Sequence, residues 1–574
     1  VGWPAEVVAA GETAALAVAA IIDNSGEVTD AGDAVELPLV VRELAVPVYE
    51  YATGNVEGSG EIELNRIDDA LPTSEITLEV SRSPAGTLLN GLEYLIGFPY
   101  GCVEQTMSRA LPNAVVSRAF SRLGIPAPIE FDLDRLVNES AQRLYGFQHE
   151  EGGWGWWFDD EGDAYQTAWV LFGLATMADA GHEIDPGVIE RGAAFLRERL
   201  DRAEPRTRAY MLYSLAVAGE LDKAGAAAAP ALLDEVENGI NPRLLDPFSL
   251  AALALALDAA GEDDAAQAAM DHLAALVEID GDMAWWGAGN DGQYDRKVMA
   301  SSVRSTALAL SAFVRLRPGD DLEPLIVNYL MERRRGNGWG TTNETAHAVI
   351  GLTDHLLGTG LGQTTAGYDV MLNGEPLTTG TISEGELRAV IDIPLDQLQP
   401  GANTVTLTAA DGGRLYYTLN ERYQAARETI EAGGSVSVHR VYLSPDDGKQ
   451  LESIAAGDLV LVRVTVRFPQ GTRFVVVEDR VPAGLEPLNE RLNTTVHDAD
   501  FFGVRTYSWH DLGYNYKEIR DGRVTFFVTS IEGFSTQYEY LARATHSGTF
   551  TALPAEAWAM YELDVWGRSA SDEV

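Results

Sequence analysis

Three residues within one short stretch have side chains that could react with one another. The stretch GFPYGCVEQTMS, residues 97–108, contains Cys102, Glu104 and Gln105. Side chains three positions apart lie on the same face of a helix, so the Cys102 thiol and the Gln105 carboxamide could meet. A thiol that displaces ammonia from a carboxamide forms an internal thioester, which stores the potential for acyl transfer.

Cys102 is the only cysteine in the chain, and several other uses of it are open at this point. An internal disulfide is excluded. A buried cysteine with a packing role needs no special neighbours. A hydrolase nucleophile needs a histidine base, and none of the nine histidines lies in a recognisable local signature. A metal site needs further Cys or His ligands at ligand spacing, and the sequence around Cys102 has none.

A thioester at this position needs support from its surroundings. Pro99 and Gly101 predict a turn that leads into a helix, whose N-terminal end favours a thiolate. Glu104 could assist proton transfer. Because water hydrolyses a thioester, the site also needs an apolar shield. The aromatic residues that could form this shield are Tyr100 beside the site and Trp154, Trp156 and Trp157 in the nearest Gly-Trp segment.

The pattern of apolar residues changes twice along the chain. Residues 1 to about 80 contain short Val-rich runs separated by Pro and Gly, which predict strands. Residues 84–358 have apolar residues at helical spacing, and three related segments, GGWGWWFDD, MAWWGAGND and GNGWGTTNE, lie between pairs of helices. Recurring helical hairpins predict a closed ring or solenoid. The strand pattern returns from about residue 361, so the helical block interrupts β material.

The composition excludes several classes of partner. The chain has 41 basic and 87 acidic residues, a net charge of -46, which repels nucleic acid and anionic membrane surfaces. It contains no run of 18 apolar residues, so we predict no membrane span. The acids in the Gly-Trp segments lack the spacing of a calcium loop, and we predict no metal or organic cofactor.

Four stretches of the sequence resemble one family. PYGCVEQT is similar to the thioester motif of the α2-macroglobulin and complement superfamily in its bacterial form, with Gly101, Cys102, Glu104 and Gln105 where the family has them. GGWGWWFDDEGDAYQTAWVLFGLATMADAG resembles the second helical hairpin of the thioester domain, and GNGWGTTNETAHAVIGL resembles its closing segment. EAWAMYELDVWGRS resembles the end of the last macroglobulin domain. The resemblance covers essentially the whole chain.

The resemblance implies a multidomain α+β fold. An α/α toroid, the thioester domain, is inserted in a CUB-like β-domain, and a macroglobulin-type β-sandwich follows. The expected divisions are 1–32 for a β segment that ends a preceding macroglobulin-like region, 33–75 and 361–428 for the two halves of the CUB-like domain, 76–360 for the toroid, and 429–574 for the C-terminal macroglobulin domain.

In function, the resemblance implies a broad-spectrum protease inhibitor that acts once per molecule and is therefore not an enzyme. A protease cleaves a bait segment, the molecule rearranges, and a lysine amine of the protease attacks the carbonyl of Gln105 while Cys102 leaves as a thiol. The resemblance also gives Met560 and Tyr561 of the last domain the role of covering the thioester. We expect the bait segment and the upstream macroglobulin domains to lie outside this chain.

Two further expectations concern location and acceptor. Bacterial relatives face the periplasm, often on a lipid anchor upstream of this region, so we expect the periplasmic side of the cell envelope rather than the extracellular space. Complement-type relatives have a histidine in the thioester domain that redirects the acyl group to hydroxyls. No histidine stands in a matching context here, which favours amines as acceptors. We expect His347 and His355 to be surface or packing residues.

Two alternatives differ in kind from the protease trap. A complement-like protein that attaches covalently to cell surfaces would use the same chemistry with a different acceptor. An enzyme is the other, since α/α toroids also occur in terpene cyclases and prenyltransferases. Those enzymes need an Asp-rich motif or a zinc site, and the nearest candidate, FDLDR at 131–135, is more typical of a helix start with capping acids.

Overall fold

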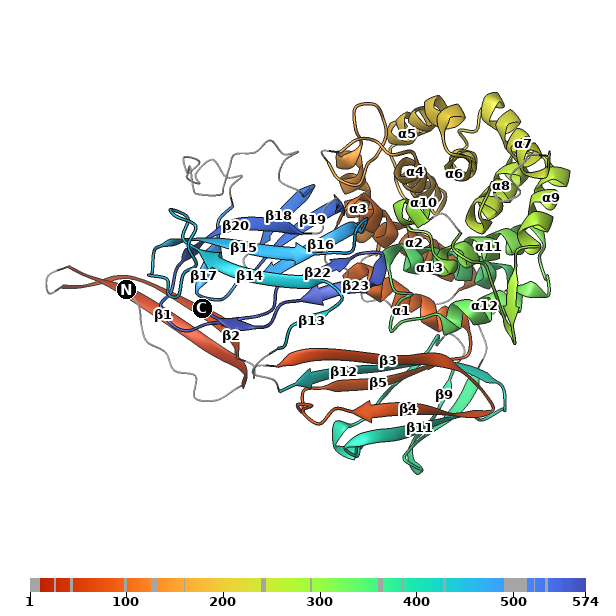
Figure 1. Ribbon diagram of the computed structural model, residues 1–574. Helices are drawn as coiled ribbons and strands as arrows, with labels where there is room; N and C mark the ends of the chain where they lie inside the picture. Colours follow the sequence, from red (N-terminus) through yellow and green to blue (C-terminus); the bar gives the residue numbers. More distant parts are fainter. Residues whose placement is uncertain are drawn as a thin grey trace.

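The computed structural model of this chain arranges its elements as a helical domain between two β-regions (Figure 1). It describes residues 11–24, 27–41, 45–97, 101–124, 133–158, 160–238, 244–289, 292–359, 365–383, 386–426, 430–489, 514–520, 522–531 and 535–574.

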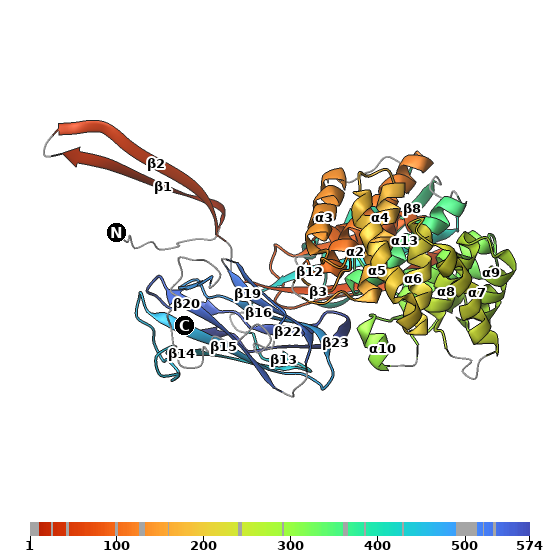
Figure 2. The ribbon, with the colours of Figure 1, turned by 90° about the horizontal axis from the view of Figure 1, so that it is seen from above.

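A long hairpin comes first in the chain. Strands β1 (Gly11–Asn24) and β2 (Glu27–Val41) pair antiparallel, and in Figure 2 they extend away from the other domains. Strand β2 continues through residue 32, so the division expected there falls inside a strand.

A β-sandwich is assembled from strands on both sides of the helical block. Its two sheets have the orders β10-β5-β12-β3 and β4-β11-β8-β9. Strand β12 pairs with both β3 and β5, so Leu419 lies opposite Ala52 and Leu78. We call this unit the split sandwich. Its strands are β3 (Val46–Glu57), β4 (Ser59–Arg66), β5 (Glu75–Ser81), β8 (Ala366–Leu372), β9 (Glu375–Ile382), β10 (Ala389–Asp392), β11 (Gly401–Ala409) and β12 (Arg414–Ala425).

The helical domain leaves the split sandwich after β5 and returns to it at β8. Figure 1 shows its helices arranged around a common centre. They are α1 (Pro84–Gly97), α2 (Val103–Leu123), α3 (Leu133–Phe147), α4 (Ala164–Asp179), α5 (Pro186–Arg199), α6 (Pro205–Val217), α7 (Lys223–Asn238), α8 (Pro247–Ala259), α9 (Asp263–Ala274), α10 (Gly292–Lys297), α11 (Ser302–Leu316), α12 (Leu322–Glu332) and α13 (Thr342–Thr359), with a short hairpin of β6 (Glu278–Asp280) and β7 (Met283–Trp285).

The three Gly-Trp segments repeat one structural device. In each, a buried indole N–H donates to a carbonyl near the end of an earlier helix, and the backbone N–H of the same Trp donates to a Thr hydroxyl near the start of a later helix. Each Trp therefore fixes two helices to the turn between them, which is a structural role. The bonds join Trp154 to Leu144 (2.8 Å) and Thr167 (2.9 Å), Trp286 to Leu273 (2.7 Å) and Thr306 (3.0 Å), and Trp339 to Leu330 (2.6 Å) and Thr345 (2.9 Å).

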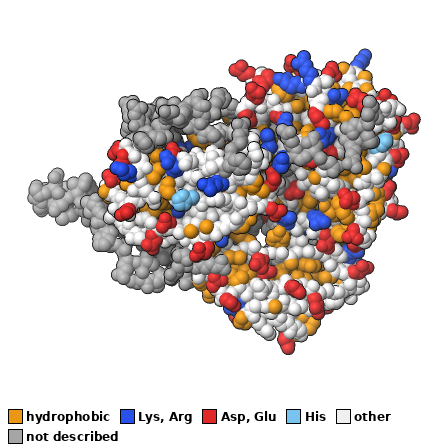
Figure 3. Space-filling view, in the orientation of Figure 1, with side chains coloured by type: hydrophobic (Ala, Val, Ile, Leu, Met, Phe, Trp, Pro, Cys, Tyr) orange, Lys and Arg blue, Asp and Glu red, His pale blue; other side chains and the backbone are white. Residues whose placement is uncertain are grey.

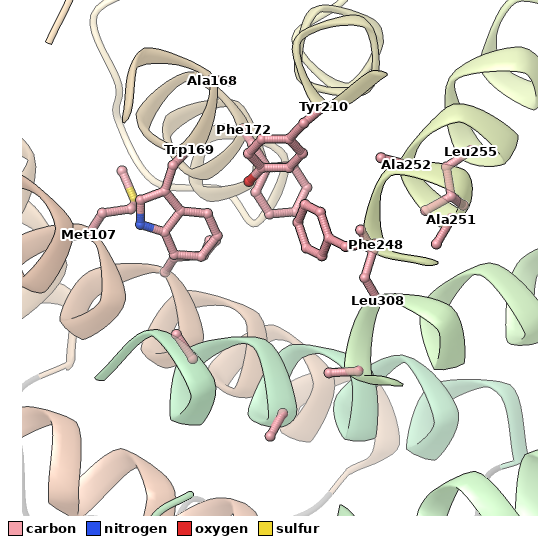
Figure 4. Close-up of a cluster of buried hydrophobic side chains, with 14 of the residues drawn as sticks. Met107, Ala168, Trp169, Phe172, Tyr210, Phe248, Ala251, Ala252, Leu255 and Leu308 are labelled. Carbon is pink, nitrogen blue, oxygen red and sulfur yellow. The ribbon is translucent and has the colours of Figure 1, made fainter. Parts of the chain in front are cut away.

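Large side chains fill the centre of the helical domain. Trp169, Phe172, Tyr210 and Phe248 converge there from three helices, and Met107 of α2 reaches the same cluster (Figure 4). Helix α4 approaches α2 closely, because a Cβ at Gly173 would lie 2.1 Å from the Met107 sulfur. The N-terminal half of α2 is therefore packed closely against α4.

A second β-sandwich ends the chain, and we call it the terminal sandwich. Its main sheets have the orders β13-β23-β22-β16-β19-β18 and β14-β15-β20-β17. Its strands are β13 (Gly433–Gly434), β14 (Ser437–Leu443), β15 (Leu459–Arg467), β16 (Arg473–Arg480), β17 (Leu485–Pro487), β18 (Tyr516–Arg520), β19 (Arg523–Ser530), β20 (Thr536–Ala544), β21 (Thr551–Ala552), β22 (Glu556–Ala559), β23 (Glu562–Arg568) and β24 (Asp572–Glu573).

The terminal sandwich packs directly on the helical domain. Phe474, Val476, Phe527 and Met560 are buried in the same apolar cluster as the helical core, not in the core of their own sandwich. The two domains therefore share a continuous apolar interior, and the first turn of α2 lies within it.

On the face of the molecule drawn in Figure 3, the acidic side chains are spread out rather than concentrated in one patch. On the face drawn in Figure 3, Asp and Glu side chains are scattered over the helical domain and both sandwiches, with Lys and Arg among them. Among the described residues, no helix combines the length and the apolar character that a membrane crossing needs.

The contact between α11 and α13 gives a test of this packing. A Cβ at Gly351 of α13 would lie 2.5 Å from the carbonyl oxygen of Ala307. We expect Gly351→Val to lower the free energy of unfolding of the helical domain by about 1–3 kcal/mol, because added atoms force closely packed helices apart. Chemical denaturation followed by far-UV circular dichroism measures this.

Gly146→Ala is the matched control, since Gly146 lies in α3 with open space around its Cβ position. That change should leave stability the same or raise it by up to about 1 kcal/mol, the helix propensity difference between Gly and Ala. Equal stability of the Val variant and the unmodified protein would contradict the close contact of α11 and α13.

Candidate functional site

The first turn of α2 carries the three residues of the sequence motif, all buried. Cys102 is the N-cap residue, with extended backbone angles, and its side chain is fully buried. Gln105 Oε1 accepts the backbone N–H of Cys102 at 3.3 Å, while the Cys102 side chain faces the backbone N–H of Gln105. This reciprocal arrangement is a capping box with sulfur in place of a hydroxyl. It brings the thiol and the carboxamide together, as their spacing predicts.

Neighbouring segments fix the entry to this helix. Arg143 of α3 donates to the carbonyl of Gly101 at 2.7 Å. A Cβ at Gly101 would lie 2.8 Å from the same guanidinium, so a larger residue there would require Arg143 to shift. The backbone N–H of Val103, which has no partner inside the helix, donates to the carbonyl of Trp156 at 3.1 Å. Gly101 therefore serves the geometry of the motif.

Glu104 lies within the site as a fully buried carboxyl group. Ser108, one turn further along α2, donates to its Oε1. Thr342, the first residue of α13, donates to Oε2 at 3.0 Å, and Tyr561 of the terminal sandwich donates to the same oxygen. Glu104 is thus part of the domain contact as well as of the motif.

Burial dominates the electrostatics of these groups. It raises the pKa of the Cys102 thiol well above its usual range, and the nearby Glu104 carboxylate raises it further. Burial also raises the pKa of Glu104, while the hydroxyls of Ser108, Tyr561 and Thr342 oppose that shift because they stabilise the charged form. The sulfur is therefore held as a neutral thiol despite its place at a helix N-terminus.

Two consecutive residues of the terminal sandwich close the site. Met560 and Tyr561 form the turn between β22 and β23. The Met560 sulfur accepts a hydrogen bond from Nε2 of Gln105 at 3.1 Å, and the Tyr561 hydroxyl donates to Glu104. Both side chains thus lie against the motif, where the resemblance to the family had placed them.

The Gly-Trp residues expected near the site divide into two groups. Trp156 stacks on Phe474 with ring centroids 3.9 Å apart and lies 5.9 Å from the Tyr561 ring. Trp157 packs on Phe527, 4.8 Å away between centroids. Trp154 instead turns toward α3 and α5, where its ring lies against Gly192. Trp156 and Trp157 lie at the domain contact, and Trp154 supports the turn that holds them.

One expected shielding residue, Tyr100, lies outside the described residues. Four residues that contact the site were not predicted from the sequence: Arg143, Ser108, Thr342 and Phe474. Ser108 stands four positions after Glu104, a helical spacing that could have indicated a bond between them. Phe474 has a backbone φ of 53°, which is rare outside glycine and is not readable from a Val-rich strand.

His347 and His355 are buried, which corrects the expectation that they could be surface residues and leaves packing as their role. Nδ1 of His347 lies 2.9 Å from the carbonyl of Asn343, and its ring stacks on Trp169 with centroids 4.7 Å apart. Burial and the nearby Arg304 guanidinium together lower the pKa of His347 to about 3. A neutral ring fixed in this way belongs to the core.

A cavity of about 640 Å³ lies at the other end of the toroid, beside the C-terminal half of α2. Its acids are already bound, since Asp179 pairs with Arg118 and Asp354 accepts the Ser311 hydroxyl at 2.6 Å. Within the described residues, no three His, Cys, Asp or Glu side chains are grouped as metal ligands. These contacts give no support to the cyclase alternative.

Sequence comparisons match two parts of the chain to family profiles. The profile described as "Bacterial Alpha-2-macroglobulin MG10 domain" matches residues 436–564, and that described as "A-macroglobulin TED domain" matches residues 76–204. The α2-macroglobulin of Thermotoga maritima is 27% identical over 62% of this chain and 19% of its own length. That of Escherichia coli is 25% identical over 92% of this chain and 32% of its own. The chain thus spans about a fifth to a third of the length of these relatives.

Solved structures share the fold. Native E. coli α2-macroglobulin, from domain MG7 to the C-terminus, has a TM-score of 0.72 at 19% identity and covers 98% of this chain and 93% of its own. The cryo-EM structure of the native E. coli protein has a TM-score of 0.76 at 20% identity and covers 98% of this chain and 35% of its own. The multidomain α+β fold expected from the sequence is confirmed.

A helical domain that matches a TED profile, with the first turn of α2 covered by the terminal sandwich, is the arrangement found in the macroglobulin fold. Two domains of the chain match α2-macroglobulin profiles, and the chain is similar to the C-terminal portion of the bacterial α2-macroglobulins.

The buried His347 ring predicts a pH dependence of stability. The folded state keeps the ring neutral down to about pH 3, whereas an unfolded chain protonates it below its ordinary value of 6.5. The unfolded state therefore binds more protons in this window, and stability falls as the pH drops from about 6.5 toward 3. One such group contributes a slope of up to about 1.4 kcal/mol per pH unit. Denaturation of the helical domain at several pH values measures the slope.

His347→Leu should show a flatter slope over this window, although it is less stable at neutral pH because the stack and the hydrogen bond are altered. His546→Gln, at an exposed position in the terminal sandwich, is the control and should keep the slope of the unmodified protein. An unchanged slope in the Leu variant would show that His347 does not cause it.

Proposed function

We propose that this chain is the reactive portion of a bacterial protease trap, in which Cys102 and Gln105 form an internal thioester. The observation that carries the proposal is their position: a thiol and a carboxamide lie together in a fully buried helix turn under the terminal sandwich. A buried polar cluster of this kind is costly to maintain and is typical of a functional site. The match of two domains to α2-macroglobulin profiles supports the same function.

The reaction has two stages. First, the Cys102 sulfur attacks the side-chain carbonyl carbon of Gln105, a carbon–sulfur bond forms, and ammonia leaves. Later, an amine attacks the same carbon, a carbon–nitrogen bond forms, the carbon–sulfur bond breaks, and Cys102 regains its proton as a thiol. The second stage consumes the thioester, so each molecule reacts once.

The trigger in this proposal is separation of the terminal sandwich from the helical domain. Met560, Trp156 and Phe474 exclude water while the domains are docked. Cleavage of a bait segment, which we place in the part of the protein upstream of this chain, would release the sandwich and admit a lysine amine of the attacking protease. We place the whole protein on the periplasmic side of the cell envelope, as a covalent endopeptidase inhibitor.

The domain divisions are part of the proposal. We assign the split sandwich to the CUB-like domain, the helical block to the thioester domain and the terminal sandwich to the last macroglobulin domain. We favour amines over hydroxyls as acceptors because, among the described residues, no histidine is hydrogen-bonded to the side chains of Cys102, Glu104 or Gln105. A preference for amines distinguishes the proposed protease trap from a complement-like protein that attaches covalently to cell surfaces.

Intact mass spectrometry tests the thioester. We expect the untreated protein to be lighter than its sequence by one ammonia, because forming the bond expels ammonia. Methylamine is a suitable probe, since Salmonella α2-macroglobulin has been solved after reaction with it. Treatment should add one methylamine and expose one titratable thiol.

Cys102→Ala should show neither the mass deficit nor the methylamine adduct. A mass equal to that of the sequence, with Cys102 already titratable both in this chain and in the longer protein, would remove the proposal.

The shield can be tested separately. Met560→Ala should speed the methylamine reaction by at least about tenfold, because losing a buried Met costs about 2–5 kcal/mol of packing and loosens the docked domain. The release of the Cys102 thiol over time measures the rate. Met371→Ala, in strand β8 of the split sandwich, is the matched control and should react at the original rate. Equal rates in the two variants would show that Met560 does not protect the site.

A further inference from the structure

The Glu104 carboxylate accepts hydrogen bonds from hydroxyl groups in three separate parts of the protein. Ser108 belongs to its own helix, Thr342 begins α13, and Tyr561 comes from the terminal sandwich. Tyr561 lies 457 positions away in the sequence, and its hydrogen bond to Oε2 crosses the domain contact. Of these three donors, Tyr561 is therefore the one that leaves when the sandwich separates.

The three donors weaken Glu104 as a base. Each hydroxyl stabilises the charged carboxylate, whereas burial favours the protonated form and raises the pKa. Removing the Tyr561 hydroxyl while the terminal sandwich stays docked keeps Glu104 buried and leaves the effect of burial on its pKa less opposed. The carboxylate then binds a proton more strongly, and proton transfer to it becomes more favourable.

The same turn of the sandwich contacts both the carboxylate and the reacting carboxamide. Met560 holds Nε2 of Gln105, and Tyr561 holds Oε2 of Glu104. Burial raises the pKa of the Tyr561 phenol, and the neighbouring Glu104 carboxylate raises it further, so the phenol and the carboxylate share one electrostatic environment. Glu104 is placed to exchange protons with the reacting groups.

The acyl transfer needs a proton carrier. An amine that attacks a thioester must lose a proton, and the departing sulfur must gain one. The burial that raises the pKa of Cys102 makes departure as a free thiolate unfavourable in this site. A single group that takes the first proton and delivers the second satisfies both needs.

We propose that Glu104 is this proton shuttle and that the Tyr561 hydroxyl suppresses it while the terminal sandwich is docked. The inference rests on the proposed thioester. The amine nitrogen bonds to the Gln105 carbonyl carbon, its proton passes to the Glu104 carboxylate, the carbon–sulfur bond breaks, and Glu104 returns the proton to the Cys102 sulfur. Atoms and charge balance, and no co-reactant is needed.

This arrangement gives the docked state two separate safeguards. The apolar side chains keep nucleophiles out, and the phenol keeps the shuttle weak against any small amine that enters. Tyr561 also lines a cavity of about 540 Å³ at the domain boundary, together with Arg333, Arg335 and Glu344. The Tyr561 phenol therefore adjoins both that cavity and Glu104. The cavity is where a small molecule would first approach.

The test is the pH dependence of the methylamine reaction, expressed per free amine, in protein whose mass deficit has first been confirmed. Tyr561→Phe keeps the ring against Trp156 and Phe474 but removes the hydroxyl. We expect a rate about threefold to tenfold higher near pH 8, and a loss of rate on acidification that begins at higher pH, because Glu104 is the stronger base. Ser108→Ala removes a donor inside α2 and leaves the terminal sandwich unchanged. It should shift the acid limb of the pH–rate profile, the pH range in which the rate falls on acidification, in the same direction.

Phe527→Leu is the matched control, since it loosens the packing on Trp157 and leaves the donors of Glu104 in place. If Phe527→Leu accelerates the reaction, its rate should still fall on acidification at the same pH as that of the unmodified protein. The proposal is overturned if the acid limb is the same in all three variants, or if Phe527→Leu shifts it as far as Tyr561→Phe does. A protein without the mass deficit would instead refute the thioester itself.

Discussion

Exclusion of water from the first turn of α2 is the condition on which the rest of this structure depends. The turn contains a thiol, a carboxamide and a carboxyl group, and all three are buried. Burial is possible because the terminal sandwich contributes Phe474, Val476, Phe527 and Met560 to the core of the helical domain. The polar atoms are satisfied by bonds that only the docked arrangement supplies in full. Docking and protection of the site are thus one event.

Local spacing predicted the reactive pair, because the i, i+3 rule acts within one helical turn. It could not predict the partners of Glu104. Thr342 and Tyr561 lie 238 and 457 positions from it, and nothing in their own neighbourhoods marks them as its donors. Met560 and Tyr561 were expected from the family resemblance, whereas Phe474, which stacks on Trp156 at the domain contact, was not expected at all. Contacts across domains depend on how whole sandwiches dock, and periodicity carries no information about that.

The fold was more predictable than the site. Helical periodicity and the recurring Gly-Trp segments predicted hairpins around a ring, and each Trp proved to join two helices through its indole and its backbone N–H. The return of strands after the helices predicted an insertion, which the pairing of β12 with β3 and β5 realises. The exact domain boundaries were harder to predict from the sequence, because the boundary expected at residue 32 falls inside the continuous strand β2.

The insertion has a mechanical consequence. The helical domain is joined to the split sandwich at two points, after β5 and before β8, so any rotation between these two units must strain a pair of covalent links at once. The terminal sandwich follows β12 through one link. Among the described residues, the position of the terminal sandwich therefore depends more on its noncovalent contacts with the helical core, at Phe474, Val476, Phe527 and Met560, than on covalent links.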